Sequence, residues 1–96
     1  MKLFIRLIYL PDTKNFELTI GNNRWKIKAA EVVAMIADAR KQMVDATDAM
    51  TEFTLIVPNS RLKLTDVNSR NGLAQIINYL DRVWLSFQAS PFAKDI

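Results

Sequence analysis

The chain has 96 residues, of which 50% are hydrophobic and 24% are charged, and its formal net charge is +3. This composition is typical of one folded domain, spanning residues 1–96, and excludes a disordered chain. Because cysteine and histidine are absent, disulfides, thiolate nucleophiles, most zinc sites and the commonest proton shuttle at neutral pH are excluded. The lack of cysteine also fits a protein of the reducing cytoplasm.

The charges are distributed unevenly along the chain. Residues 1–28 carry six basic and two acidic groups, whereas residues 29–52 carry two basic and five acidic groups. Residues 53–65 add two basic groups and no acid, and residues 66–96 carry three of each. No stretch approaches the ~20 consecutive apolar residues that span a bilayer, so we expect no contact with a membrane.

Residues 2–10 form the first predicted strand. Alternation gives it two largely apolar faces, which is typical of a strand at the centre of a sheet or of one whose outer face is covered by something else. One face carries Phe4, Arg6, Ile8 and Leu10. Residues 11–15 contain Pro, Asp and Asn and are predicted to form a turn.

Two later segments have similar sequences, and each is predicted to form a β-hairpin. Residues 16–28 align without a gap on residues 53–65, with five identities in thirteen positions. A turn at Asn22–Asn23 would pair Ile20 with Trp25, and a turn at Asn59–Ser60 would give the second hairpin the equivalent pairing. The similarity is compatible with an internal duplication and with two unrelated hairpins of the same pattern.

One amphipathic helix is predicted after each hairpin. The first covers residues 29–50, with Val33, Ala37 and Val44 at the margin of its apolar stripe and Arg40 at the edge of the core. Its apolar stripe consists of Val32, Ile36, Ala39, Met43, Ala46 and Met50. The second covers residues 70–88, is capped near Asn68 or Ser69, and ends before Pro91.

These elements predict an α+β domain with the order strand, hairpin, helix, hairpin, helix. We expect a five-stranded, mainly antiparallel sheet with both helices on one face and with two similar hairpin–helix halves. The other face would be open, with apolar residues at its centre and basic residues around them. The residues predicted to bind a partner there are Phe4, Arg6, Ile8, Leu10, Arg24, Lys26, Lys28, Ile56, Arg61 and Lys63.

No pattern in the sequence indicates an enzyme. Asp38, Asp45 and Asp48 share one side of the first helix, and we interpret them as a solvent-exposed helix surface. The chain has two glycines and therefore no glycine-rich phosphate-binding loop. Its serines and threonines have no histidine to act as a base. We expect no catalytic residue, no metal site and no cofactor.

The predicted open face indicates a non-catalytic binding protein, such as a regulator, an adaptor or an inhibitor. Its basic rim favours an acidic protein partner, and a homodimer that pairs this face with itself is the simplest way to cover the apolar centre. Nucleic-acid binding through the same basic residues is the alternative, although Phe4 is the one aromatic side chain expected on this face. The sequence leaves the partner and the oligomeric state open.

Overall fold

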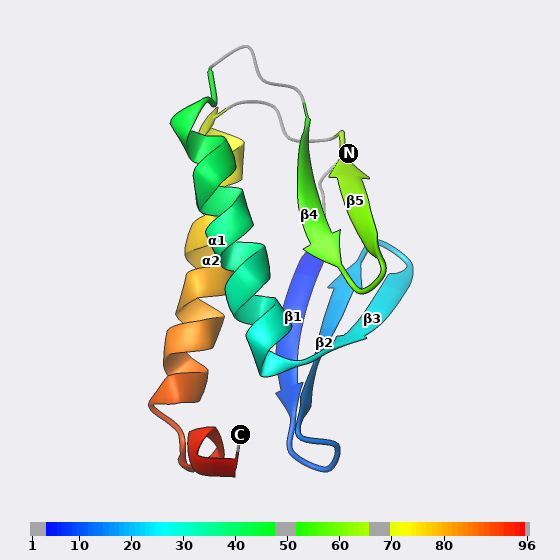
Figure 1. The fold of residues 1–96 in the computed structure, drawn as a ribbon, viewed down its shortest axis with the longest axis vertical. Coiled ribbons are helices and arrows are strands. Elements are labelled where there is room, and N and C mark those ends of the chain that lie inside the picture. The colour runs from blue at the N-terminus through cyan, green and yellow to red at the C-terminus, as the bar shows by residue number, and fades with distance from the viewer. Residues whose placement is uncertain (1–3, 48–51, 66–69, 96) are drawn as a thin grey trace.

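The computed structural model describes residues 4–47, 52–65 and 70–95. Its elements in chain order are β1 (Ile5–Leu10), β2 (Asn15–Ile20), β3 (Asn23–Ile27), α1 (Ala29–Val44), β4 (Phe53–Val57), β5 (Ser60–Leu64), α2 (Arg70–Gln88) and the short 3-10 helix η1 (Pro91–Asp95). Both long helices lie on one side of the strands (Figure 1). The predictions that involve Lys2, Asp48, Met50, Asn68 and Ser69 fall outside the described residues.

The strands form two antiparallel sheets, so the prediction of one five-stranded sheet is wrong. The first sheet has the order β1-β2-β3, and the second consists of β4 and β5. β1 is therefore an edge strand rather than the central strand that its two apolar faces indicated. Alternation within a strand defines its buried face, but it does not define which distant strands pair. The predicted α+β class with antiparallel sheets is confirmed.

The first hairpin forms where it was predicted, but its turn lies one residue earlier. Ile20 pairs with Asn23, which places the turn at Gly21–Asn22. Gly21 has a φ of +58°, and a glycine with positive φ at the first turn position is the pattern of a type II′ hairpin. Cross-strand partners thus differ by two positions from the predicted ones, and each side chain keeps its predicted face.

The second hairpin differs from its prediction in the same way. Val57 pairs with Ser60, which places the turn at Pro58–Asn59 instead of Asn59–Ser60. Asn59 has a φ of +63°, in the left-handed region that asparagine tolerates better than most residues. A proline followed by a residue with positive φ is the pattern of a type II turn.

The two hairpins are equivalent in register as well as in sequence. Phe16 pairs with Ile27, and Phe53 pairs with Leu64 thirty-seven residues later. β3 and β5 have the same burial pattern, and β2 from Phe16 onward has the pattern of β4. A position in one hairpin can therefore be compared directly with the position 37 residues away in the other.

One apolar core joins both sheets to both helices. Leu18 on β2 and Leu55 on β4 are fully buried in it. Five aromatic rings adjoin this core, and their contacting pairs have centroid separations of 4.7 to 5.9 Å. These rings belong to Tyr9, Phe16, Trp84, Phe87 and Phe92.

α1 is shorter than predicted and exposes a different side. It ends at Val44 instead of near residue 50, where Asp and Thr residues compete with helical hydrogen bonding. Val33 and Val44 are 47% and 84% exposed, although they were expected at the margin of the apolar stripe. Their exposure follows from the orientation of α1. The opposite flank of the helix, which carries Asp38 and Gln42, faces the second sheet and forms hydrogen bonds to it.

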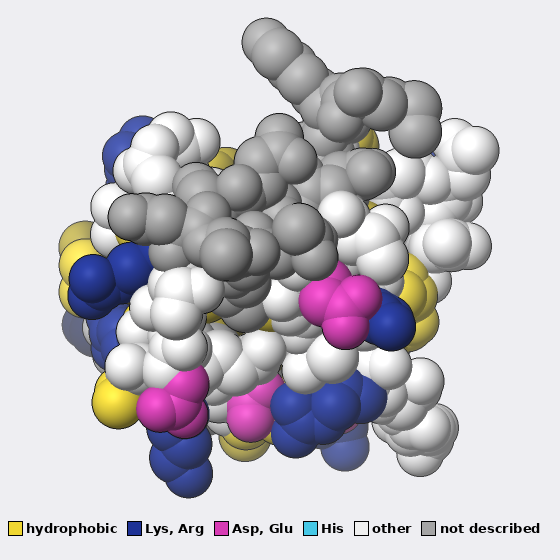
Figure 2. Space-filling model, turned by 90° about the horizontal axis from the view of Figure 1, so that it is seen from above, with side chains coloured by type: hydrophobic (Ala, Val, Ile, Leu, Met, Phe, Trp, Pro, Cys, Tyr) yellow, Lys and Arg dark blue, Asp and Glu magenta, His cyan; other side chains and the backbone are white. Residues whose placement is uncertain are grey.

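α2 has the predicted bounds, and an ion pair joins it to α1. Arg40, which was expected at the edge of the core, contacts Asp81 of α2 through its guanidinium group. Acidic and basic side chains also lie next to one another at the end of the molecule seen in Figure 2. Opposite charges are thus paired at several places on the described surface.

Gly21→Ala should change the free energy of unfolding in opposite directions for the observed turn and for the predicted one. An alanine held at positive φ costs about 1–2 kcal/mol, so we expect the free energy of unfolding to fall. If residue 21 lay within a strand, alanine would instead stabilise the protein by about 0.5–1 kcal/mol. No atom lies within 4 Å of the added Cβ, so steric contact does not contribute.

Urea denaturation measures this difference, with Asn22→Ala as a control that we expect to change stability by less than about 0.5 kcal/mol. A stabilised Gly21→Ala variant would contradict the observed register.

Candidate functional site

Six of the ten predicted binding residues lie on the face of the first sheet that points away from the core, which we call the outer face. They are Phe4, Arg6, Ile8, Leu10, Arg24 and Lys26. Arg6, Thr19 and Arg24 form one cross-strand row, and Ile8, Glu17 and Lys26 form the next. Phe4 is 56% exposed, whereas Ile8 and Leu10 are half-buried. The outer face thus has basic residues along β3, and apolar residues together with Arg6 along β1.

Lys28 lies beside this face, directly after β3. It is exposed and precedes the first residue of α1. Its backbone N–H donates to the Glu31 Oε1 at 2.8 Å, which caps the helix. Lys28 therefore lies at the junction of the first sheet with α1.

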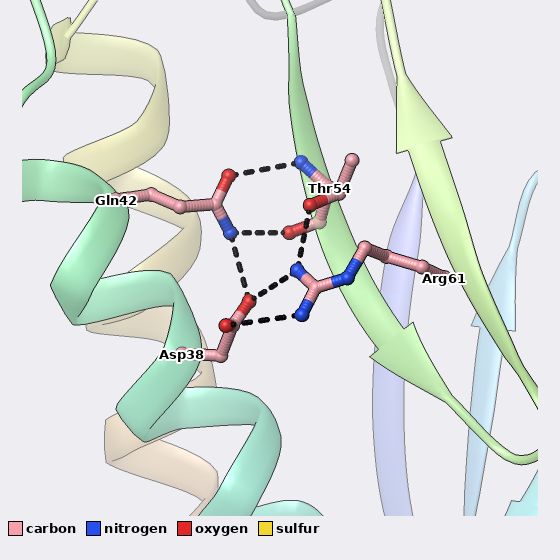
Figure 3. Close-up of polar contacts among 4 residues, drawn as sticks. All are labelled: Asp38, Gln42, Thr54 and Arg61. Atoms are coloured by element: carbon pink, nitrogen blue, oxygen red, sulfur yellow. Dashed lines mark hydrogen bonds and ion pairs between the residues drawn. The ribbon is translucent and has the colours of Figure 1, made fainter.

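Ile56, Arg61 and Lys63 lie on the second sheet, so the predicted surface is divided between two sheets. Arg61 reaches across β4 to α1 (Figure 3). Its Nη1 donates to Asp38 Oδ2 at 2.9 Å and to Thr54 Oγ1 at 3.0 Å, and its Nη2 donates to Asp38 Oδ1 at 3.4 Å. This is the two-pronged geometry of a guanidinium–carboxylate pair, and it holds Arg61 against its own chain.

Lys63 is also paired within the chain. Its Nζ lies 3.1 Å from Glu52 Oε2. Both side chains are more than half exposed, so the pair adds little to stability, but it places a carboxylate next to the lysine. Both cations of the second hairpin therefore have an acidic neighbour.

The equivalent cations of the first hairpin form no ion pair with the residues that the structure describes. Arg24 and Lys26 lie 37 residues before Arg61 and Lys63. Neither has an ion-pair partner in residues 4–47, 52–65 and 70–95, and the same is true of Arg6. Similar sequences thus carry unequal free charge.

Side chains from the helices close the outer edge of one strand in each sheet. Gln42 Nε2 donates to the Thr54 carbonyl at 2.7 Å, and Gln42 Oε1 accepts from the Thr54 N–H at 3.0 Å, so one amide takes the place of a neighbouring strand beside β4 (Figure 3). Tyr79 Oη accepts from the Leu7 N–H at 2.9 Å, at the edge of β1. Gln42 and Tyr79 are themselves 37 residues apart, so the equivalence of the two halves extends into the helices.

This equivalence shows how the acidic positions around the two hairpins differ. Glu52 corresponds to Asn15, and Asp38 corresponds to Gln75. The two carboxylates that pair with the second hairpin are therefore neutral amides in the other copy, whereas Thr54 of the second hairpin corresponds to Glu17, which lies opposite Lys26. An amide can accept a hydrogen bond, but it does not neutralise a cation.

The polar contacts between α1 and the second sheet were not among the predictions from the sequence. The interpretation of Asp38 as solvent-exposed surface is wrong, because its side chain is 20% exposed and pairs with Arg61. Gln42 also donates to Asp38 Oδ2 at 3.0 Å, which completes the cluster. The available signal was the Asp-x-x-x-Gln spacing on a helix that precedes a basic hairpin, but its meaning depends on how the helix is turned.

The described part of the chain offers no cluster of three or more acidic, histidine or cysteine side chains that could hold a metal ion. Neither helix, over the residues described, is long and apolar enough to cross a membrane. The chain matches no protein-family model, no curated protein and no solved structure. Its function must therefore be argued from its own side chains.

We predict that Gln42→Leu lowers the free energy of unfolding by about 1–3 kcal/mol, because both backbone groups of Thr54 lose their partner. The matched control is Gln75→Leu, an exposed glutamine on α2, where we expect a change within about 0.5 kcal/mol. Chemical denaturation of both variants measures the difference. Equal effects of the two substitutions would show that the amide does not hold the edge of β4.

Proposed function

We propose that this chain is a non-catalytic binding protein, acting as a regulator, an adaptor or an inhibitor, and that its outer face contacts an acidic protein. The observation that carries this proposal is the unequal pairing of equivalent cations. Arg61 and Lys63 form ion pairs with carboxylates of the chain, whereas Arg24 and Lys26 form none among the described residues, although Glu17 on β2 lies opposite Lys26. A cation that forms no ion pair with the described residues can attract a carboxylate of another molecule.

The arrangement of the outer face supports a protein partner. Interfaces commonly have an apolar centre and a polar rim. Phe4, with 56% of its surface exposed, and the half-buried Ile8 provide apolar area, and basic residues border them. Arg6, Arg24 and Lys26 outnumber the one carboxylate in these rows, which belongs to Glu17. The net positive charge favours an acidic partner and accelerates encounter with it.

The alternatives have weaker support. Binding of single-stranded nucleic acid uses aromatic platforms, and Phe4 is the one aromatic residue among those of the outer face. A phosphate backbone crossing both hairpins would also have to displace the carboxylates from Arg61 and Lys63. A homodimer through the outer face would bring two cationic surfaces together.

The absence of cysteine suits a cytoplasmic partner.

Equivalent lysines in the two hairpins provide a matched test of this proposal. The immobilised protein is used to capture proteins from the lysate of its source organism after nuclease treatment, and Lys26→Gln is compared with Lys63→Gln. We expect Lys26→Gln to weaken binding of the captured protein by up to about fivefold, equivalent to about 1 kcal/mol, because a free cation is lost. Lys63→Gln removes a lysine that is already paired and should leave binding unchanged.

Phe4→Asp tests the apolar part of the same surface. It replaces an exposed side chain, so the fold should be retained, and we expect capture to be lost. Capture that depends equally on Lys26 and Lys63, or that survives Phe4→Asp, would contradict the proposal. Capture that disappears after nuclease treatment would favour the nucleic-acid alternative, and tight binding of a single-stranded oligonucleotide at low salt would confirm it.

A further inference from the structure

Among the described residues no strand pairs with the outer edge of β3, and the direction of its backbone groups follows from the contacts of β1. The Leu7 N–H points to Tyr79 and hence away from β2. In antiparallel strands the backbone groups of successive residues point to alternate neighbours, so Leu18, the partner of Leu7, directs its groups to β3. Leu18 pairs with Trp25, and the N–H and C=O groups of Arg24 and Lys26 therefore point away from the sheet. In Figure 1 no labelled element lies next to the edge of β3 that faces away from β2.

β5 has an equivalent edge but a different charge. Because Thr54 directs its backbone groups to Gln42, its partner Lys63 directs its own groups away from β4, as does Arg61 two residues earlier. The side chains of Arg61 and Lys63 are held by Asp38 and Glu52. Of these two edges, that of β3 alone combines outward backbone groups with cations that have no ion-pair partner among the described residues.

We propose that an extended, acidic segment of the partner protein adds to the first sheet as a fourth strand beside β3. This inference rests on the proposed function and specifies how the partner binds. A strand in this position would satisfy the outward N–H and C=O groups of Arg24 and Lys26, as in other cases of strand addition. Its side chains on the outer face would lie next to the two cations, where Asp and Glu give favourable cross-strand pairs.

The other face of the added strand would meet Trp25. This side chain faces the core from β3 and is half-buried. Alternate residues of the bound segment would contact it, and apolar side chains suit that position. The partner segment is therefore expected to alternate acidic and apolar residues.

The charges of β3 disfavour two other occupants of this edge. A second copy of the chain would place Arg24 and Lys26 against cations of the same kind, and like charges on adjacent strands repel. Basic residues on an edge strand prevent such self-association. A nucleic acid lacks the alternating donors and acceptors of a polypeptide backbone, so it cannot pair with this edge.

Peptide binding observed by amide hydrogen exchange tests the inference. The probe is an acetylated and amidated peptide of alternating Glu and Val, and the control is the corresponding peptide of alternating Lys and Val. When nine in ten molecules carry the acidic peptide, we expect exchange at the Arg24 and Lys26 amides to slow about tenfold. The amides of Arg61 and Lys63 should be unaffected, and the basic peptide should not bind.

Matched proline variants remove the same donor from each edge. We expect Lys26→Pro to abolish peptide binding and Lys63→Pro to preserve it, since proline is tolerated on edge strands. If Lys26→Pro does not fold, Lys26→Gln in its place should weaken peptide binding by up to about fivefold. Absence of peptide binding, binding without slower exchange at Arg24 and Lys26, or equal slowing on β5 would overturn the inference.

The same variants separate this inference from the proposed function. If Phe4→Asp abolishes capture of the natural partner and Lys26→Pro does not, the outer face binds the partner without strand addition. If neither substitution affects capture, both proposals fail.

Discussion

A β-strand sends alternate side chains to opposite faces and alternate backbone groups to opposite neighbours, and the rest of this structure depends on that period of two. It places Leu18 and Leu55 in the core and Arg24 on the outer face. It also leaves the backbone groups of Leu7 and Thr54 pointing away from their own sheets. The two helices bury the apolar faces, and they also close these two edges with a tyrosine and a glutamine.

β1 makes the two halves of the molecule different. On one side, α1 meets β4 directly through Gln42. In the other half, β2 is the strand equivalent to β4, but β1 pairs with its edge. Tyr79 of α2 therefore accepts its hydrogen bond from β1 and not from β2. β1 and the residue before it also contribute Phe4 and Ile8, the apolar part of the outer face. The strand that breaks the symmetry of the repeat therefore also builds the proposed contact surface.

The sequence predicted which side chains face inward more accurately than it predicted how the strands assemble. Alternation identified Leu18 as buried and Lys26 as exposed, and these assignments held although both turns were misplaced, because partners shifted by two positions. The first turn was misplaced because Asn22–Asn23 is itself a favourable turn pair, whereas the residue with positive φ in that turn is Gly21. Division into two sheets was not predictable, since local patterns contain no information on pairing between distant strands.

The candidate site shows the same division between local and tertiary information. Equal spacing in the repeat predicted equal roles for Arg24 and Arg61. The structure separates them, because Asp38 reaches Arg61 only through the orientation of α1 beside β4. Once Gln42 and Tyr79 are recognised as equivalent, the sequence shows amides at the two positions that correspond to Asp38 and Glu52.

Amide hydrogen exchange in the free protein tests most directly the claim that helical side chains close two strand edges and leave β3 open. The account predicts slow exchange at Leu7 and Thr54, whose N–H groups donate to Tyr79 and Gln42. It predicts fast exchange at Arg24 and Lys26. Fast exchange at Leu7 and Thr54, or slow exchange at Arg24 and Lys26 without any ligand, would contradict it.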